Sequence, residues 1–410
     1  MLLGSCAVVA IGLGLLQASR EVQPGALWFA AGGLFLSWLA ALAVLRIARI
    51  EGDPYLLPVA CLLSGIGWAM VYRLEPELGM RQALWIAFGL GAFVLISLLL
   101  RDYRALEEYR YLYLAAGVIL QASVMMFGVE INGARLWFRF GSYYFQPVEI
   151  VKILMILFLA AYLRRFRTWI RLSLRSPEGR LPRRALLVLG IGWAIAEAVL
   201  ILQKDLGMAL LFMGIFLTMF YIATGRTDLA ALAGGLFVVG AWLGYLLFSH
   251  VQVRVQAWLD PFAHSEAGGY QMAQALFSLS WGGLFGTGLG LGKPNLIPEA
   301  PTDFIFVALA EELGLLGGAA LLALLVVLVQ RAFRVALTAQ DEFGTLLAAG
   351  LAVLVAWQSL ILIAGTLKVI PMTGITLPFI SYGGSSMVSN FLILALLRRM
   401  SRRPRGARGN

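Results

Sequence analysis

Long apolar runs alternate with short polar breaks along almost the whole chain. A membrane-spanning helix takes roughly 20 mostly apolar residues, and twelve runs approach that length. They lie near residues 2–17, 26–47, 55–73, 83–100, 111–128, 148–163, 185–201, 208–224, 229–249, 304–330, 344–366 and 385–397. The pattern predicts an all-α fold, a polytopic membrane helical bundle of about twelve transmembrane helices.

Composition supports this class of fold. Of the 410 residues, 60% are hydrophobic and 13% are charged, which is too apolar for an ordinary water-soluble domain. Cys6 and Cys61 lie inside apolar runs without CxxC spacing, so neither a disulfide framework nor a zinc site is indicated. His250 and His264 are the only histidines, so we expect no histidine metal centre.

The net charge of +10 reflects membrane topology better than nucleic-acid binding. Twenty-two of the 32 Lys and Arg residues fall in alternate breaks, with the largest cluster at 164–184 and the last at 398–408. The positive-inside rule then places both termini in the cytoplasm. We expect a multi-pass protein of the inner (cytoplasmic) membrane that contacts anionic lipids and binds no nucleic acid.

Three outer segments are long enough to build a site, residues 129–147, 250–303 and 367–384. Charged side chains near apolar runs need partners or a role. Glu149 and Lys152 are three residues apart, so they share a helix face. They form either a structural ion pair or a pair that contacts substrate. Lys204 and Asp205 precede the run 208–224, which Asp205 is placed to cap.

The loop 250–303 carries further signals. Its apolar stretch 270–281 predicts a helix too short to span the membrane, lying at the interface or re-entering. Six glycines follow in 282–292, and they indicate close backbone packing rather than a nucleotide loop, because no strand precedes them and no Gly-Lys-Ser/Thr follows. Thr302 is a candidate N-cap with Asp303 in the first helical turn. Asp303 either complements the helix dipole or accepts a proton.

Several motifs in order resemble the SEDS family, the RodA, FtsW and SpoVE proteins that polymerise lipid II into glycan strands. The likeness begins near residue 55 and covers nearly all of the chain beyond it. The motifs are NGARLWFRFGSYYFQPVEIVK at 132–152, LQKDLGMAL at 202–210, RVQAWLDPF at 254–262, GGYQMAQALFSLSWGGLFGTGLG, PEAPTDFIFVALAEELGLLG and IPMTGITLPFISYGGSS at 370–386.

The resemblance implies functional roles for individual residues. The essential acid of the family matches Asp303, and further residues of functional weight match Arg81, Trp137, Glu149, Lys152 and Asp205. Four departures stand out: Pro301 replaces a usual His, Lys204 replaces the proline of QPDLG, Leu136 replaces the second arginine of GARRW, and Tyr144 stands where an arginine is common. Lys204 is therefore a candidate replacement for a phosphate contact.

The resemblance also implies a domain organisation. The family core has ten helices, so residues 1–50 form an additional N-terminal helix pair. Residues 51–400 form the polymerase membrane domain with the large extracytoplasmic loop 250–303, and residues 401–410 form a basic cytoplasmic tail.

The implied reaction is inverting transfer between lipid-linked disaccharides, with Asp303 as the base that deprotonates the acceptor hydroxyl. Candidate groups for stabilising the pyrophosphate are Arg81, Arg135, Lys152, Lys204 and Arg254. Trp137 is a candidate for packing on sugar or isoprenoid, and Glu299 lies near Asp303 in sequence. A divalent cation, Mg or Mn, is compatible with this chemistry, and no organic cofactor is expected.

The implied partners are lipid II, undecaprenyl-pyrophosphate-linked glycan, membrane lipids and a class B penicillin-binding protein. Two other classes of function stay open. Twelve helices with intramembrane charges also suit a lipid II flippase, although no repeat at half length is evident. The third class is a non-enzymatic scaffold of the division or elongation machinery. Between these two cellular roles, the short termini favour RodA-like elongation over FtsW-like division.

Overall fold

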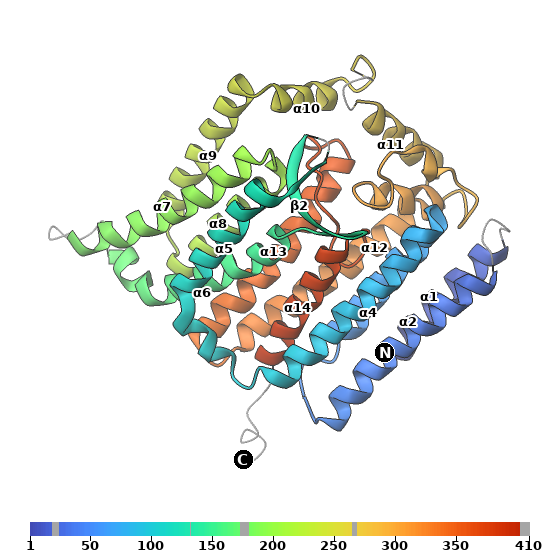
Figure 1. Ribbon diagram of the computed structural model, residues 1–410, viewed down its shortest axis with the longest axis horizontal. Helices are drawn as coiled ribbons and strands as arrows, with labels where there is room; N and C mark the ends of the chain where they lie inside the picture. The colour runs from blue at the N-terminus through green and yellow to red at the C-terminus, as the bar shows by residue number, and fades with distance from the viewer. Residues whose placement is uncertain (19–23, 132, 173–179, 265–268, 402–410) are drawn as a thin grey trace. The chain divides into compact units, whose positions relative to one another are not determined.

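The computed structural model describes residues 1–18, 24–131, 133–172, 180–264 and 269–401. Its polypeptide is mostly helical (Figure 1). It divides into two compact units, each discontinuous in sequence. The first unit comprises 1–101, 252–332 and 358–410, and the second comprises 102–251 and 333–357.

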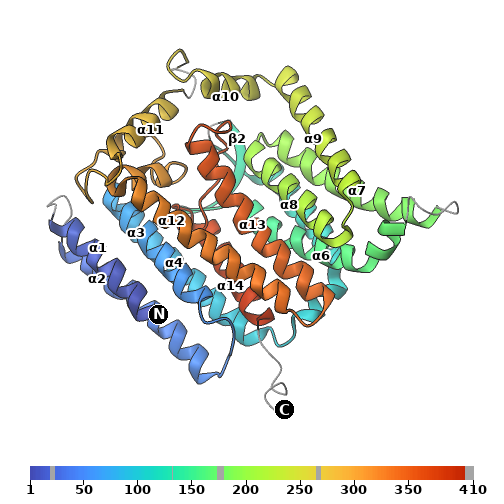
Figure 2. The ribbon, with the colours of Figure 1, turned by 180° about the vertical axis from the view of Figure 1, so that it is seen from behind.

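The first unit is a bundle built on two antiparallel neighbours joined by a single residue, α3 and α4. Helix α1 packs against α3, α2 packs against α4, and α14 packs along α4 (Figure 2). The unit also contains α11, most of α10 and of α12, the end of α13 from residue 358 onward, and the segment that follows α13, whereas the first part of α13 belongs to the second unit. The bounds are α1 Leu2–Ala18, α2 Pro24–Ile47, α3 Leu56–Leu74, α4 Pro76–Leu99, α10 Ser249–Leu259, α11 Gly269–Gly282, α12 Ile305–Thr338, α13 Glu342–Thr366 and α14 Gly384–Met400.

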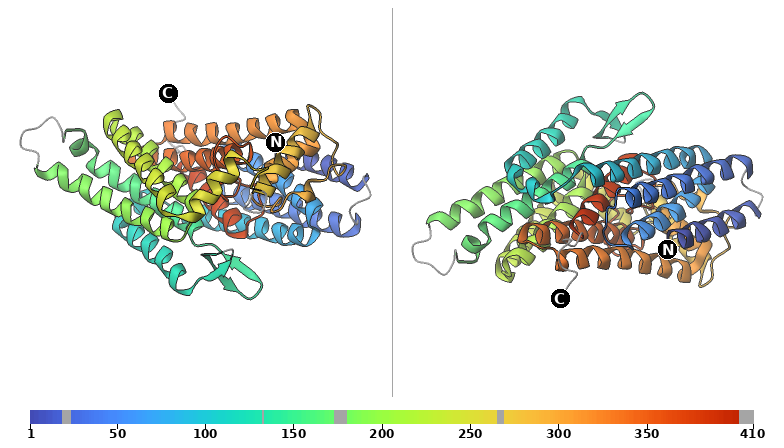
Figure 3. Two further views of the ribbon diagram at one scale, coloured as in Figure 1. Left: turned by 90° about the horizontal axis from the view of Figure 1, so that it is seen from above. Right: turned by 90° about the horizontal axis from the view of Figure 1, so that it is seen from below.

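The second unit packs α6 against α5, α7 and α8, with α9 against α8. A small antiparallel sheet, ordered β1-β2-β3, joins α5 to α6 and stands out from these helices (Figure 3). In its register, Glu130 pairs with Arg135 and Phe138 pairs with Phe145. The bounds are η1 Tyr103–Tyr109, α5 Arg110–Phe127, β1 Val129–Ile131, β2 Ala134–Phe140, β3 Tyr143–Phe145, α6 Val148–Leu172, α7 Arg180–Leu202, α8 Leu206–Thr224 and α9 Thr227–Leu247.

Each of the twelve apolar runs coincides with a helix, which confirms a polytopic helical membrane protein. Eight of the described helical segments are long and apolar enough to cross a membrane by length and composition, and α1 and Leu186–Leu202 are shorter apolar helices. The count of twelve spans stays a prediction for the rest. The domain division at residues 50 and 400 also stays a prediction, and most of the basic tail, 402–410, lies outside the described residues.

A break inside α12 explains the glycine-rich loop. Gly314 has φ 70° and ψ −174°, which interrupts the helix. The loop after α11 fills the break: the Thr287 and Gly288 amides donate to the Glu311 and Glu312 carbonyls, each at 3.0 Å. A Cβ on Gly286 would lie 2.2 Å from the Glu312 carbonyl oxygen, so only glycine fits there. The prediction of close backbone packing is confirmed for Gly286 and for Gly282, where an added Cβ would lie 2.4 Å from the Ala310 carbonyl oxygen, but not for Gly283, where it would meet nothing within 4 Å.

Two buried carboxylates fasten the same loop. Glu311 accepts from the Lys293 amide at 2.6 Å, and Glu312 accepts from the Gly290 amide at 2.9 Å. The Arg73 guanidinium of α3 lies 3.4 Å from the Glu312 carboxylate and donates to the Gly292 carbonyl at 3.2 Å. Because the carboxylates are at most 2% exposed, these contacts compensate for their desolvation. The loop is therefore an integral part of the first unit.

Candidate active site

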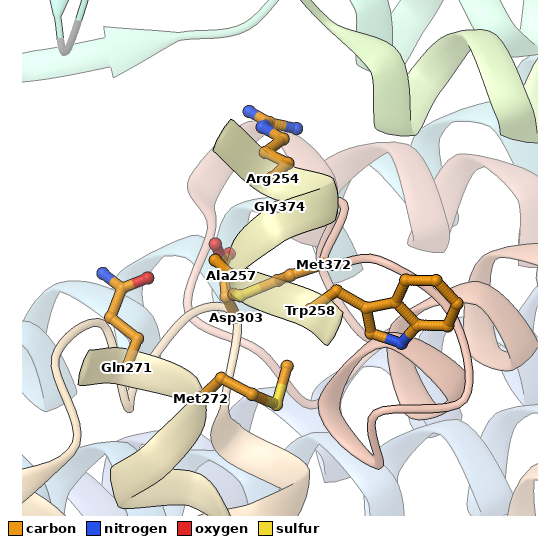
Figure 4. Close-up of a pocket in the computed structure, with 8 residues that line it drawn as sticks. All are labelled: Arg254, Ala257, Trp258, Gln271, Met272, Asp303, Met372 and Gly374. Carbon is orange, nitrogen blue, oxygen red and sulfur yellow. The ribbon is translucent and has the colours of Figure 1, made fainter. Parts of the chain in front are cut away.

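A pocket of about 210 Å³ lies in the first unit, and Asp303 is one of its lining residues (Figure 4). Four segments that are distant in sequence build it: α10, α11, the turn before α12 and the loop after α13. The lining residues are Arg254, Ala257, Trp258, Gln271, Met272, Asp303, Met372 and Gly374. The pocket thus places one carboxylate, one guanidinium and one indole ring around a single space.

The turn that carries Asp303 differs from the predicted helix start. Helix α12 begins at Ile305, so Asp303 precedes the helix and is not in its first turn. Thr302 is not the N-cap, because its hydroxyl donates backwards to the Glu299 carbonyl at 3.1 Å and to the Glu299 carboxylate at 3.2 Å. Glu299 adopts φ 57°, which lets its carbonyl accept the amides of Thr302, Asp303 and Phe304 at 3.2, 3.1 and 3.4 Å.

Apolar packing holds this turn against α11. Ala300 and Phe304, on either side of Asp303, are buried with Ala275 of α11, and Ile297 and Val307 complete the cluster. Each of these side chains is at most 2% exposed, so the chain on both sides of Asp303 is fixed in the protein interior. The Asp303 side chain itself is half-buried and lines the pocket.

Arg254 is the cation of the pocket. It comes from α10, is half-buried, and lies above Asp303 in the view of Figure 4. One turn further along α10, the Trp258 indole N–H donates to the Lys368 carbonyl at 3.0 Å. That bond ties α10 to the loop after α13, so the two segments that bring Arg254 and Gly374 to the pocket are joined directly.

Two other predicted residues of this unit do not line the pocket. Arg81 is exposed in the second turn of α4. Glu299 is adjacent to the pocket through its backbone, but its carboxylate accepts the Thr302 hydroxyl. The structure therefore brings together Asp303 and Arg254 from the predicted set within the first unit.

The remaining predicted residues belong to the second unit. Glu149 and Lys152 form an ion pair on one face of α6, and their side chains are 1% and 0% exposed. The predicted pairing is confirmed. Such complete burial removes both charged groups from solvent, which is the environment of a structural ion pair.

The break before α8 also has the predicted geometry. The Asp205 carboxylate accepts the Met208 amide at 3.1 Å and so caps α8. The neighbouring Lys204 adopts φ 62°, and its ammonium donates to the Gly133 carbonyl at 3.3 Å. This contact places Lys204 against the start of β2.

Arg135 and Trp137 lie on β2 of the small sheet. The Arg135 guanidinium pairs with Glu130 at 3.2 Å, and both side chains are more than half exposed. Trp137 is half-buried and stands opposite Val129 in the register. Lys204, Arg135 and Trp137 are therefore grouped around this sheet.

Sequence reasoning missed six pocket residues, namely Ala257, Trp258, Gln271, Met272, Met372 and Gly374. All of them fall inside the motifs RVQAWLDPF, GGYQMAQ and IPMTGIT, so the motifs carried a signal. None of these side chains is charged, so the chemistry of the single residues did not mark them as candidates. Among the described residues no group of three or more His, Cys, Asp or Glu side chains is placed to hold a metal ion.

Comparison with known proteins agrees with these motifs. The family model described as "Cell cycle protein", of FtsW, RodA and SpoVE, matches residues 60–406. The chain is 41% identical over 417 aligned positions to "Peptidoglycan glycosyltransferase RodA" of Mycobacterium leprae, covering 98% of this chain and 89% of the relative. It is 34% identical to "Probable peptidoglycan glycosyltransferase FtsW" of Nitrosococcus halophilus, covering 85% of this chain and 92% of the relative.

Solved structures show the same architecture. A chain from work described as "Structural coordination of polymerization and crosslinking by a peptidoglycan synthase complex" is 28% identical with a TM-score of 0.71, covering 85% of this chain and 97% of that chain. The rod shape determining protein RodA of Thermus thermophilus is 26% identical with a TM-score of 0.62, covering 85% of this chain and 96% of its own. The chain belongs to the FtsW, RodA and SpoVE family.

Proposed function

We propose that this chain is a peptidoglycan glycosyltransferase that polymerises lipid II into glycan strands at the outer face of the cytoplasmic membrane. The observation that carries the proposal is the pocket in which Asp303 and Arg254 lie together. Relatives with 41% and 34% identity bear the names peptidoglycan glycosyltransferase RodA and probable peptidoglycan glycosyltransferase FtsW, which supports the same activity here.

The reaction needs a base and a group that stabilises negative charge. An acceptor sugar hydroxyl attacks the anomeric carbon of the donor from the face opposite the leaving group, so the configuration inverts. The new glycosidic C–O bond forms as the C–O bond to undecaprenyl pyrophosphate breaks. Asp303 takes the hydroxyl proton, and Arg254 stabilises the charge that develops on the departing pyrophosphate.

The exposure of the other predicted side chains divides them into candidates for substrate contact and residues with a structural role. Arg81, Arg135, Lys204 and Trp137 carry exposed or half-buried side chains, which leaves them available to contact the substrate. The burial of Glu149 and Lys152 supports a structural role for that pair, and the hydrogen bond from the Met208 amide supports a capping role for Asp205.

The divalent cation stays a proposal, and the oxygen donors of the pocket limit how the protein could bind it. Asp303 is the one carboxylate among the pocket-lining residues. Mg²⁺ is often held by one or two carboxylates together with substrate phosphates. If a Mg or Mn ion arrived on the pyrophosphate, Asp303 would be the pocket residue that could hold it, with one carboxylate oxygen left to accept the proton. Such an ion would supply positive charge for the leaving group.

Localisation and partners follow from the same proposal. The arginine-rich breaks support a multi-pass inner-membrane protein with both termini in the cytoplasm. A class B penicillin-binding protein is the proposed partner, since the related chain belongs to a peptidoglycan synthase complex described as coordinating polymerization and crosslinking. The higher identity to RodA than to FtsW relatives favours a role in elongation.

The test is reconstitution of the purified full-length chain with lipid II and, in parallel, with a class B penicillin-binding protein. We expect glycan strands from the wild type and a loss of at least about 100-fold for Asp303→Asn, because the amide cannot accept the proton. Asp303→Asn keeps the shape of the side chain, so thermal unfolding serves as the control for folding.

Other outcomes identify the two alternatives. Translocation of lipid II across vesicles without any polymer would indicate a flippase. Full rescue of a depleted cell by Asp303→Asn, with no polymer from either protein, would indicate a scaffold. Glycan strands made equally well by the wild type and by Asp303→Asn would remove Asp303 from the mechanism.

A further inference from the structure

The backbone immediately before Asp303 is held by a second segment, residues 374–382, from the loop between α13 and α14. The Tyr382 amide donates to the Pro301 carbonyl at 2.8 Å. The Ser381 hydroxyl donates to the Thr302 carbonyl at 2.6 Å. That carbonyl belongs to the peptide group that joins Thr302 to Asp303. The hydrogen bond therefore fixes the orientation of the peptide group that leads into the Asp303 Cα, which carries the carboxylate side chain.

Further hydrogen bonds hold the Ser381 side chain and backbone in place. Its hydroxyl oxygen accepts the Leu377 amide at 2.8 Å, so the donated proton is directed at Thr302. Its carbonyl accepts the Gln82 side-chain amide of α4 at 3.1 Å. The Ser381 side chain is 2% exposed and Gln82 is fully buried, so water does not compete for these bonds. The hydroxyl has one donor bond and one acceptor bond, both made inside the protein.

The turn that carries Ser381 is anchored to the helix bundle. Phe379 adopts φ 66°, a conformation that is costly for a bulky residue and persists only when its surroundings enforce it. Its ring is buried and packs edge-on against Phe391 of α14, with centroids 5.4 Å apart. A Cβ on Gly67 of α3 would lie 2.3 Å from the Ile380 carbonyl oxygen, so α3 touches the turn directly.

The opposite end of the same segment reaches the carboxylate. Gly374 lines the pocket with Asp303, and a Cβ placed on Gly374 would lie 3.5 Å from Asp303 Oδ2. Gly374 has φ 71°, which glycine adopts without strain. The segment 374–382 thus bonds to the backbone before Asp303 at one end and lies beside the Asp303 carboxylate at the other.

We propose that Ser381 is a positioning residue for the glycosyl transfer, orienting the Asp303 carboxylate toward the acceptor hydroxyl through its hydrogen bond to the Thr302 carbonyl. The inference rests on the proposed function. Ser381 touches neither substrate nor reacting atoms. It acts through Asp303, because rotation of the 302–303 peptide group would swing the carboxylate out of line with the pocket.

The primary test compares Ser381→Ala with the wild type in lipid II polymerisation by the full-length chain. Misplacement of a catalytic group by about 1 Å costs on the order of 100-fold, so we expect kcat to fall about 10- to 100-fold with KM changed less than about 3-fold. A split of this kind separates positioning from substrate binding. Ser381→Cys and Ser381→Thr keep a donor at the same place, and at least one of them should recover part of kcat.

Ser64→Ala is the matched control. Ser64 is fully buried, and its hydroxyl donates to the Cys61 carbonyl within α3 at 3.0 Å. The variant removes the same chemical group at equal burial without touching the Asp303 turn. We expect kcat of Ser64→Ala to stay within about 2-fold of the wild type, and the thermal unfolding midpoint of each alanine variant shows whether its fold is retained.

A second pair of variants keeps the proposal testable if Ser381→Ala does not fold. Gly374→Ala adds a methyl group beside Asp303 Oδ2. Gly225→Ala carries the same backbone strain, with φ 66° and nothing within 4 Å of the added methyl. We expect kcat to fall at least about 10-fold for Gly374→Ala and to be unchanged for Gly225→Ala, because only the first displaces the base.

Failure of this inference is distinct from failure of the proposed function. If the wild type polymerises lipid II, Asp303→Asn is inactive and Ser381→Ala keeps full kcat, the positioning role is overturned and the base remains. The same holds if Ser381→Ala raises KM alone, or if neither Ser381→Cys nor Ser381→Thr recovers activity. If the wild type makes no polymer under any condition, the proposed function itself fails.

Discussion

Lys152 forms an ion pair with Glu149 on one face of α6, and neither side chain is more than 1% exposed. Removing one member leaves the other as an uncompensated buried charge, which typically costs about 3 to 5 kcal/mol. We therefore expect Lys152→Met and Glu149→Gln each to lower the thermal unfolding midpoint strongly. The double variant should be less destabilised than either single variant, because it leaves no charge behind.

Arg135→Met is the matched control for this prediction. Arg135 pairs with Glu130 at 3.2 Å, but both side chains are more than half exposed, and such pairs contribute about 1 kcal/mol or less. If Lys152→Met unfolds no more easily than Arg135→Met and instead raises the KM for lipid II, the pair contacts substrate.

Arg254 shares the pocket with Asp303, so its loss should act on the chemical step. Removing a group that stabilises developing charge lowers kcat by about 100- to 1000-fold in well-studied enzymes, and we expect Arg254→Ala to approach this range. Arg254→Lys should retain part of the activity. Arg139→Ala removes an exposed arginine of β2 and should leave kcat unchanged. Equal rates for Arg254→Ala and Arg139→Ala would contradict the role in leaving-group stabilisation.

Trp258 offers an aromatic surface in the same pocket, with its indole N–H bound to the Lys368 carbonyl at 3.0 Å. We expect Trp258→Ala to raise the KM for lipid II by about 10-fold, because aromatic contacts contribute about 0.5 to 1.5 kcal/mol beyond area burial. Trp258→Phe should have a smaller effect, since a ring remains. Steady-state kinetics on lipid II measure both. An unchanged KM in Trp258→Ala would exclude the indole from substrate binding.

Asp341, between α12 and α13, should give stability a pH dependence. Burial raises the pKa of Asp341, but hydrogen bonds from Tyr103, the Gly344 amide and Arg104 outweigh burial and leave the pKa lowered. The Tyr103 hydroxyl lies 2.5 Å and the Gly344 amide 2.8 Å from the carboxylate. A carboxyl group whose folded-state pKa is depressed stabilises the fold above its unfolded pKa and loses that contribution as pH falls.

The contribution should therefore be complete above pH about 4, the usual pKa of aspartate, and should disappear as pH falls through the lowered value. We expect Asp341→Asn to be less stable than the wild type at pH 7 and to approach it at pH about 3. Thermal unfolding measured from pH 7 to pH 3 tests this. Glu108→Gln, which changes an exposed carboxylate, should follow the wild type throughout. A stability difference for Asp341→Asn that does not change with pH would contradict the assignment.

Local chemistry made several features predictable. Three-residue spacing placed Glu149 and Lys152 on one helix face, and Asp205 capped the helix that follows it, because both arrangements depend only on neighbouring residues. Gly282 and Gly286 were correctly interpreted as sites of close backbone packing. The motif match identified Asp303, and the pocket around it confirms that the residue lies in a cavity.

The errors arose where tertiary contacts decide the local structure. Thr302 is a residue type that often caps helices. However, hydrogen bonds from Tyr382 and Ser381 to the Pro301 and Thr302 carbonyls hold this stretch in a turn, and the helix begins only at Ile305. The break at Gly314 depends on the loop that fills it, which no local pattern reveals. The small sheet was missed although its sequence contains Asn-Gly, a recognised hairpin signal between strand-forming residues.

The loop that connects α11 to α12 completes the backbone hydrogen bonding of the interrupted helix α12. Backbone groups freed at Gly314 cannot be solvated by hydrocarbon, and the amides of Leu315 and Leu316 instead donate to the Gly283 and Leu284 carbonyls at 2.9 and 3.2 Å. Unfolding of this loop would leave backbone N–H and C=O groups without hydrogen-bond partners in both the loop and α12. Its amide hydrogens should therefore resist deuterium exchange as long as those of the surrounding helices, and proteases should cut elsewhere first.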